Sequence, residues 1–280
     1  MATELVLLGT AGGPTPKAGR AAPAQAILID GHTYVVDAGN GVGRQLVRAG
    51  IPLNSLDTVF LTHHHSDHNA DLGTLLLLAW ADDLDHTVRV LGPEPTVAML
   101  ETFLSMQATD IAIRVADEGR SPLGPLIQAR DIDGSIAVVH EDERVRVSCV
   151  RVDHPPFEVA LGYRFDTADR SIVISGDTAP CPALVELAAG ADVLVHEVIH
   201  RPSIAWLAPG RSGARLAAHL AASHTDVEAV GGIAAAAGVG LLVLSHLVPG
   251  HDVVPEAEWL RLASMGYAGP VVVGQDLMRL

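Results

Sequence analysis

The feature that most constrains this chain is the heptapeptide Thr-His-His-His-Ser-Asp-His at residues 62–68. It follows directly on residues 57–61, Asp-Thr-Val-Phe-Leu, a run typical of a buried strand. Imidazole is the commonest metal ligand of proteins, and an aspartate oxygen is a ligand that zinc accepts. Because the predicted strand ends where the motif begins, the motif lies on a loop at a sheet edge, where α/β proteins build their sites. The sequence therefore predicts a fold organised around a metal centre.

The length and composition predict a large apolar core. With 280 residues and 49% hydrophobic content, we expect one domain spanning residues 1–280. The longest apolar stretch, 233–244, is interrupted by glycines and is too short to cross a bilayer. The first residues are typical of a strand and lack the basic segment of a secretory signal, so we expect a cytoplasmic protein whose two cysteines stay reduced.

The charge balance indicates the kind of partner. The net charge is −15, with 18 Lys and Arg against 33 Asp and Glu, and the basic residues are scattered along the sequence. Because binding to phosphates requires Lys and Arg, a nucleic acid is an unexpected partner and a small molecule is favoured. The high apolar share favours a further buried surface, as in a homodimer, and leaves a hetero-oligomer open.

Short runs rich in branched residues predict strands at 5–8, 26–29, 33–36, 57–61, 88–91, 136–139, 144–152, 159–165, 171–174, 193–195, 241–244 and 271–273. Apolar periodicity and terminal signals predict helices at 42–49, 71–80, 96–108, 183–189, 226–237 and 255–265. Strands mixed with helices at two separate stages predict an α/β fold of the α+β kind, with two sheets between layers of helices.

Ligand-type residues recur after several of these strands. Within the motif, four positions fit the pattern HxHxDH: His63, His65, Asp67 and His68. Three later positions each follow an apolar strand: His154, Asp177 and His246. Any one of the three alone is more typical of a hydrogen-bonded core histidine or a turn aspartate. Together with HxHxDH, they indicate a site for two metal ions.

Several motifs of this chain resemble those of a known protein family, and the resemblance covers nearly the whole chain. The motifs that carry it are Leu8-Gly-Thr-Ala-Gly-Gly-Pro, Val36-Asp-Ala-Gly, HxHxDH, His154 followed by Gly162-Tyr-Arg-Phe, Ser175-Gly-Asp-Thr, His196-Glu197, His224-Thr and Ser245-His246-Leu. The chain resembles the metallo-β-lactamase-fold hydrolases. Within them it is most similar to the branch that holds the transfer-RNA 3′-processing endonucleases (tRNase Z) and arylsulfatase-type enzymes.

The resemblance implies a four-layer αβ/βα sandwich that holds two Zn²⁺ ions per chain, with manganese or iron as possible replacements. It implies that one zinc is bound by His63, His65 and His154. The other zinc is then bound by Asp67, His68 and His246, and Asp177 bridges the two. A hydroxide shared by the metals is the expected nucleophile, and Asp67 is expected to orient it or take its proton.

The resemblance also implies a proton donor. In the processing endonucleases, a histidine backed by a glutamate protonates the leaving oxygen, and the matching positions here are His224 and Glu197. The match is partial, because the endonuclease motif is His-Glu-Ala-Thr and this chain has His-Glu-Val-Ile. Two neighbours of the ligands have supporting roles: we expect His64 to be solvated or to support the ligands, and Asp37 to brace the ligand loops.

The substrate prediction depends on what the chain lacks. The endonucleases carry a long substrate-gripping arm between the third histidine and the bridging aspartate, and here only 23 positions separate residues 154 and 177. We therefore expect hydrolysis of a small ester-like or activated ether bond, such as an aryl sulfate, phosphodiester, lactone or aryl ether. The alternative is a transfer-RNA 3′-processing endonuclease that receives its gripping surface from a partner chain. A non-catalytic subunit that keeps the fold is a third possibility.

Overall fold

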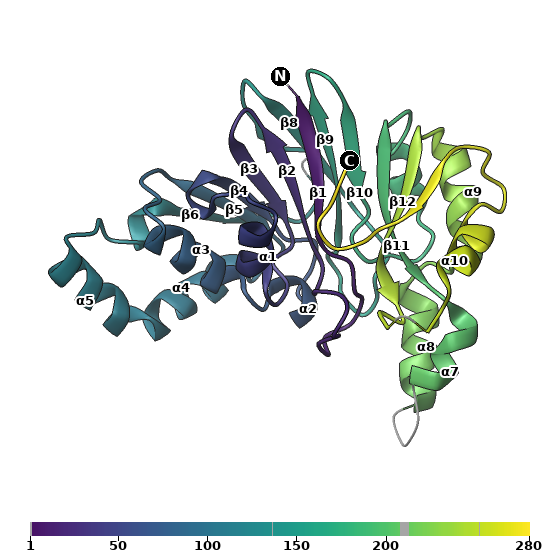
Figure 1. Ribbon diagram of the computed structural model, residues 1–280, viewed down its shortest axis with the longest axis horizontal. Coiled ribbons are helices and arrows are strands. Elements are labelled where there is room, and N and C mark those ends of the chain that lie inside the picture. The colour runs from purple at the N-terminus through teal and green to yellow at the C-terminus, as the bar shows by residue number, and fades with distance from the viewer. Residues whose placement is uncertain (1, 136, 208–212, 252) are drawn as a thin grey trace.

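Two seven-stranded sheets form the centre of the molecule (Figure 1). The structure is a computed structural model that describes residues 2–135, 137–207, 213–251 and 253–280. In spatial order, the first sheet consists of β14 (Met278–Arg279), β1 (Thr3–Gly9), β2 (Ala24–Ile29), β3 (His32–Val36), β4 (Leu56–Phe60), β5 (Val88–Gly92) and β6 (Ile127–Asp131). The second consists of β13 (Val271–Val273), β12 (Leu241–Val248), β11 (Val193–Ile199), β10 (Ser171–Ile174), β9 (Leu161–Thr167), β8 (Val145–Arg151) and β7 (Val138–Glu141).

Helices cover the outer face of each sheet and complete four layers. The first sheet packs on α1 (Val42–Arg48) and α3 (Leu72–Ala81), and the second on α6 (Pro182–Leu187), α9 (Val227–Ala237) and α10 (Glu256–Ala263). Strand β1 shows why the layers form. Leu5 and Leu7 face the core between the sheets, whereas Val6 and Leu8 face the helices, as the two-residue period of a strand requires. The predicted four-layer sandwich is confirmed.

The remaining helices lie at the periphery. The short α2 (Ser66–Asn69) lies within the histidine motif, and α4 (Thr96–Met106) and α5 (Ala108–Glu118) extend beyond β6. The pair α7 (Arg201–Leu207) and α8 (Gly213–Ser223) projects from the second half (Figure 1). Two 3₁₀ turns, Leu53–Ser55 and Gly124–Leu126, complete the elements. Among the described residues, no helix has the length and apolar character that crossing a membrane requires.

Several predicted elements differ from the observed ones. The helix predicted at 96–108 ends at Met106, and a second helix, α5, follows. The strands β6 and β14 and the helices α7 and α8 were not predicted. Strand β6, Ile-Gln-Ala-Arg-Asp, is an edge strand with no fully buried residue, so it lacks the apolar alternation that would reveal it. The strand predicted at 136–139 begins on a residue outside the described ones, and the observed β7 is Val138–Glu141.

The topology directs the chemically active residues to one edge. Strands β3 and β4 are parallel, as are β10, β11 and β12, so the carboxyl ends within each group share an edge. The histidine motif follows β4, and Asp177 follows β10. His246 lies inside β12 at a bulge, where Ser245 pairs with Glu197 but Leu247 pairs with Val198. Its φ of 46° is unusual for a residue with a side chain, and such strain concentrates at functional sites.

One buried hydrogen bond joins the two sheets next to this edge. The hydroxyl of Tyr163 in β9 donates to the carbonyl oxygen of Leu61, just after β4, over 2.7 Å. Both residues are fully buried. Without the hydroxyl, that carbonyl has no water to replace its donor, and an unsatisfied buried polar group is destabilising.

We therefore expect Tyr163→Phe to lower the free energy of unfolding by about 1–3 kcal/mol, measured by urea denaturation. Tyr267→Phe is the matched control, because the Tyr267 hydroxyl also donates to a carbonyl, that of Val239, from a partly exposed position. The free energy of unfolding should fall much less in Tyr267→Phe than in Tyr163→Phe. Equal losses for the two variants would contradict a special role for the bond between the sheets.

Candidate metal centre

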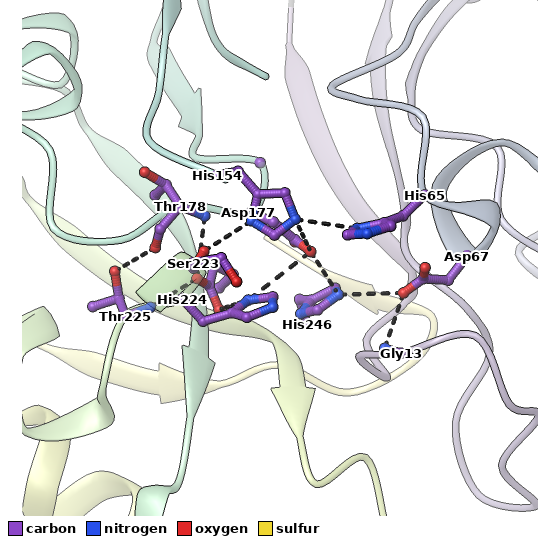
Figure 2. Close-up of polar contacts among 12 residues, drawn as sticks. Gly13, His65, Asp67, His154, Asp177, Thr178, Ser223, His224, Thr225 and His246 are labelled. Atoms are coloured by element: carbon purple, nitrogen blue, oxygen red, sulfur yellow. Dashed lines mark hydrogen bonds and ion pairs between the residues drawn. The ribbon is translucent and has the colours of Figure 1, made fainter. Parts of the chain in front are cut away.

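Seven side chains converge at the edge where the two sheets meet. Figure 2 labels His65, Asp67, His154, Asp177 and His246 among them. They come from the histidine motif, the ends of β8 and β10, and the bulge in β12. The structure thus brings together every ligand position selected from the sequence: His63, His65, Asp67, His68, His154, Asp177 and His246. These residues form two groups, and Asp177 of the first group also lies close to the second.

The first group contains three imidazoles and a carboxylate. The Nδ1 of His65 lies 2.9 Å from the Nε2 of His63 and 3.1 Å from the Nε2 of His154. The Oδ2 of Asp177 lies 3.8 Å from the same His63 nitrogen and 4.0 Å from the His154 nitrogen. The Nδ1 of His154 donates to the carbonyl oxygen of Ser223 over 2.8 Å, which leaves the lone pair on Nε2, facing the group.

The second group contains Asp67, His68 and His246. The Oδ2 of Asp67 lies 3.5 Å from the Nε2 of His246 and 3.8 Å from the Nε2 of His68. The Oδ2 of Asp177 lies 3.2 Å and 3.3 Å from those two nitrogens. One oxygen of Asp177 therefore lies between both groups, which is the position a bridging carboxylate needs.

The donor set fits divalent cations. Among the described residues, four buried atoms in the cluster have no hydrogen-bond partner: His68 Nε2, Asp177 Oδ1 and both ring nitrogens of His246. Buried polar atoms are normally paired, because leaving them unpaired is unfavourable. Nitrogen and carboxylate oxygen donors at these positions suit zinc, and a cation would give the unpaired atoms their partners.

The protonation states favour the same conclusion. Burial and the neighbouring His68 hold the pKa of His63 well below its usual value, and burial together with His154 lowers the pKa of His65 to about 4. Both imidazoles are therefore neutral near pH 7, which is the form that binds metal. Burial alone would raise the pKa of Asp177, but His246 and His68 outweigh it and hold this pKa well below the usual range. The carboxylate is therefore charged.

Asp37 braces the motif, as expected from the sequence. Its Oδ1 accepts from the backbone N–H of Thr62 over 2.8 Å, and its Oδ2 accepts from the Nδ1 of His68 over 2.7 Å. The second bond leaves the Nε2 lone pair of His68 directed at the cluster. From the other side, the backbone N–H of Gly13 donates to the Oδ2 of Asp67 over 2.9 Å (Figure 2). Such contacts orient metal ligands and fix their tautomers.

His224 and Glu197 lie together beside the cluster. The Nδ1 of His224 is 3.3 Å from the Oε2 of Glu197 and 4.0 Å from the Oδ2 of Asp177. The Oε1 of Glu197 accepts from the backbone N–H of Thr225 over 2.9 Å, which fixes the carboxylate. Burial opposes a charge on His224, but Glu197 and Asp177 outweigh it and raise its pKa to about 9.

His224 also lies close enough to Asp177 and His246 to share a cation with them. The nitrogen that faces Asp177 is, however, the one that faces Glu197. A nitrogen that carries a proton between two carboxylates has no lone pair for a metal. The geometry therefore favours His224 as a proton carrier over His224 as a ligand.

Other histidines divide between structural and cleft positions. His64 donates from Nε2 to the carbonyl oxygen of Pro93 over 2.7 Å and points away from the cluster, in accordance with its place outside the pattern. Sequence reasoning missed His219, whose ring centre lies 6.0 Å from that of His65 and 6.2 Å from that of His154. It lies on α8, and without that helix nothing in the sequence places it near the motif.

A cavity of about 440 Å³ opens above the cluster. Its walls come from the loop after β1, from α8, and from the segment after β12. Helix α8 contributes Leu216, His219 and Leu220, and the loop after β1 contributes Lys17. The site thus combines two groups of ligands, an acidic bridge and a cleft large enough for a ligand.

The brace makes a direct prediction. Asp37→Asn keeps the shape of the side chain but removes the negative charge of the carboxylate that accepts a hydrogen bond from His68. We therefore expect metal affinity to fall by about 10- to 100-fold. Zinc titration against a competing chelator measures this change. Asp192→Asn is the control, because Asp192 also accepts from a backbone N–H and a hydroxyl, those of Ser171, at a site preceding β11. Unchanged affinity in Asp37→Asn would contradict the bracing role.

Known proteins similar to this chain share its fold and its length. The family described as "Beta-lactamase superfamily domain" matches residues 32–247. Ribonuclease Z of Mycobacterium sp. (strain KMS) is 37% identical over 279 residues, which cover 99% of this chain and 95% of that protein. Ribonuclease Z of Mycobacterium avium (strain 104) is 35% identical over 281 residues, covering 99% of this chain and 97% of that protein.

Solved structures agree on the fold. The metallo-beta-lactamase fold protein YhfI from Bacillus subtilis superposes with a TM-score of 0.73 at 20% identity, over 99% of this chain and 98% of that one. Human tRNase Z, short form, superposes with a TM-score of 0.72 at 18% identity, with the same coverage. Together with the family match and the Ribonuclease Z relatives, this fold confirms the suspected branch of the metallo-β-lactamase fold.

These findings correct the substrate prediction. The expectation of a small-molecule ester or activated ether as substrate is wrong, because relatives at 37% and 35% identity over 99% of the chain are named Ribonuclease Z. The expectation that a nucleic acid is an improbable partner is wrong for the same reason. The sequence thus predicts the family correctly but not the substrate class.

The physical reason for the error lies in the missing arm. The aligned residues make up 95% and 97% of the two relatives, so little of either protein is left for an additional arm. Lack of an arm between residues 154 and 177 therefore does not separate this chain from proteins named Ribonuclease Z. With its fold, its ligand cluster and these relatives, the chain belongs to the β-lactamase superfamily of metal-dependent hydrolases, in the family of the Ribonuclease Z proteins.

Proposed function

We propose that this protein is a two-metal endonuclease that processes the 3′ end of precursor transfer RNA. The observation that carries this proposal is the meeting of seven ligand-type side chains with the His224–Glu197 pair in one cleft. The Ribonuclease Z relatives, at 37% identity over 99% of the chain, supply the substrate class. We also propose that residues 1–280 act as one domain, because both sheets contribute ligands to the cluster.

We further propose that the cations are two Zn²⁺ ions. One would be held by His63, His65 and His154, and the other by Asp67, His68 and His246, with Asp177 shared. The mixed nitrogen and oxygen donors also accept manganese and iron. Bound divalent cations would lower the pKa of a coordinated water and neutralise the charge that develops on the phosphoryl oxygens.

Two groups of the chain handle protons in this proposal. Asp67, fixed by the Gly13 N–H, orients the attacking water and accepts its proton. As the oxygen of that water bonds to phosphorus, the bond from phosphorus to the ribose oxygen breaks. The charged His224 ring gives a proton to this leaving oxygen, and Glu197, beside its Nδ1, stabilises the charged imidazole beforehand.

The proposal predicts that the purified protein removes the 3′ trailer from a precursor transfer-RNA transcript and that a chelator abolishes this activity. His65→Ala should sharply lower the metal content, measured by elemental analysis, and reduce cleavage at least about 100-fold, because it removes a ligand from the first group. His32→Ala is the control, since His32 is partly exposed and lies at the start of β3. Metal-loaded wild-type protein that leaves the transcript uncut would refute the proposal.

The proton-donor role has a separate test. His224→Ala should lower kcat for the transcript by about 10²- to 10⁴-fold while metal content stays unchanged. Hydrolysis of bis(p-nitrophenyl) phosphate should suffer far less, because p-nitrophenolate leaves without a proton. Glu197→Gln should show the same pattern in weaker form. An equal loss on both substrates would indicate that His224 binds metal or supports the fold.

A further inference from the structure

An enzyme that cuts RNA must hold phosphates, and this chain has a net charge of −15 and no arm between residues 154 and 177. The fold nevertheless gathers cations. Four of the 18 Lys and Arg residues line one groove of about 860 Å³ beside α1: Lys17, Arg20, Arg44 and Arg48. The expectation of scattered basic residues is therefore true of the sequence but not of the surface.

The groove adjoins the cleft above the metal ligands. Lys17, Pro249 and His251 line both cavities, and Lys17 also lines a small third cavity together with Arg20 and Asn40. The shared wall is the loop after β1, whose Gly13 also fixes Asp67. A chain bound in the groove therefore lies next to the cleft that holds the ligand cluster.

The hydrogen bonds decide which of the charges are available. Arg20 donates to the Thr10 hydroxyl over 2.6 Å and to the Gly274 carbonyl oxygen over 2.7 Å, so it holds the loop in place. Two carboxylates also line the groove. That of Asp276 accepts from the backbone N–H groups of Thr10 and Ala21, and that of the exposed Glu256 accepts from the side-chain amide of Gln275 over 3.4 Å. Lys17 donates to the Gly13 carbonyl oxygen over 2.9 Å, and its ammonium group keeps two further N–H donors. Lys17, Arg44 and Arg48 therefore remain as the cations that can face a ligand.

Arg44 and Arg48 form a like-charged pair on α1. They stand four positions apart on one face of the helix, and both are exposed. Arg44 has no ion pair or hydrogen bond with any described residue, and Arg48 donates only to the side-chain oxygen of Gln45. Such like-charged pairs destabilise a helix. An anion bound between them would remove this penalty, and guanidinium groups bind phosphate in a bidentate manner.

The opposite side of the metal motif has the reverse charge. A cavity of about 720 Å³ there is lined by His64 and Phe157, and its only Lys or Arg among the described residues is Arg130. It carries four carboxylates: Glu94, Asp131, Asp133 and Glu158. A polyanion is repelled on that side and attracted on the α1 side, so the two cavities define a direction for the substrate.

We propose that the groove formed by Lys17, Arg44 and Arg48, here called the basic groove, binds phosphates of the RNA next to the scissile bond. This inference rests on the proposed function. It assigns to the basic groove the substrate binding that an arm performs in the processing endonucleases. The chain then grips RNA through its own residues and needs no partner subunit for that purpose.

The test compares two double variants that each lose two positive charges. Arg44→Gln/Arg48→Gln removes the pair in the basic groove. The control, Arg114→Gln/Arg146→Gln, removes arginines on α5 and β8, remote from the groove. The melting temperatures of the two double variants should be nearly the same, since all four side chains reach the surface.

For the groove variant, we expect KM for the precursor transcript to rise at least about tenfold with kcat and metal content unchanged. The plot of log kcat/KM against log salt should become less steep by about 1.4, which corresponds to two lost phosphate contacts on a single strand. Hydrolysis of bis(p-nitrophenyl) phosphate should not change. The control variant should match the wild type in every measurement.

Binding of the labelled transcript, followed by fluorescence anisotropy in a His224→Ala background, separates this inference from the proposed function. Weaker binding by the groove variant than by the control variant supports the basic groove even if the wild type does not cut the transcript. Equal affinity and equal salt slopes for the two variants would overturn it. A wild type that does not bind the transcript at all would overturn both the groove and the proposed function.

Discussion

The structure depends on one buried carboxylate. The Oδ2 of Asp177 lies within 4.0 Å of nitrogens from five imidazoles: His63, His68, His154, His224 and His246. A charge in a nearly dry interior is unfavourable unless other charges or hydrogen bonds compensate it. Its five neighbours come from both halves of the chain, so the folds of the two sheets are coupled through this single site.

That coupling explains the local irregularities around the cluster. His246 reaches Asp177 only because β12 bulges at that point and the residue adopts a left-handed φ. The motif reaches it because Asp37 holds Thr62 and His68 at the end of β4. The bond from Tyr163 to Leu61 then holds the two sheets together near the site.

The seven ligand positions could be predicted from the sequence because most follow an apolar strand, and strand ends meet at sheet edges. The basic groove could not. Lys17 and Arg48 are separated by two strands and a helix, and their proximity depends on how the loop after β1 packs beside α1. His219 was missed for a similar reason, because α8 has no signal that relates it to the motif. Spacing along the chain reveals ligands at strand ends, whereas surfaces assembled from loops and helices depend on packing.

Net charge is therefore a poor guide to the substrate of this protein. At physiological ionic strength, the field of an exposed charge is screened over about 8 Å, so acidic residues on remote surfaces hardly affect a phosphate in the groove. A phosphate in the groove is affected mainly by the nearby charges. These are Lys17, Arg44 and Arg48 on one side of the cluster, and the carboxylates around His64 on the other. An acidic chain can thus present a short cationic path to its metal centre while the rest of its surface repels nonspecific contacts with RNA.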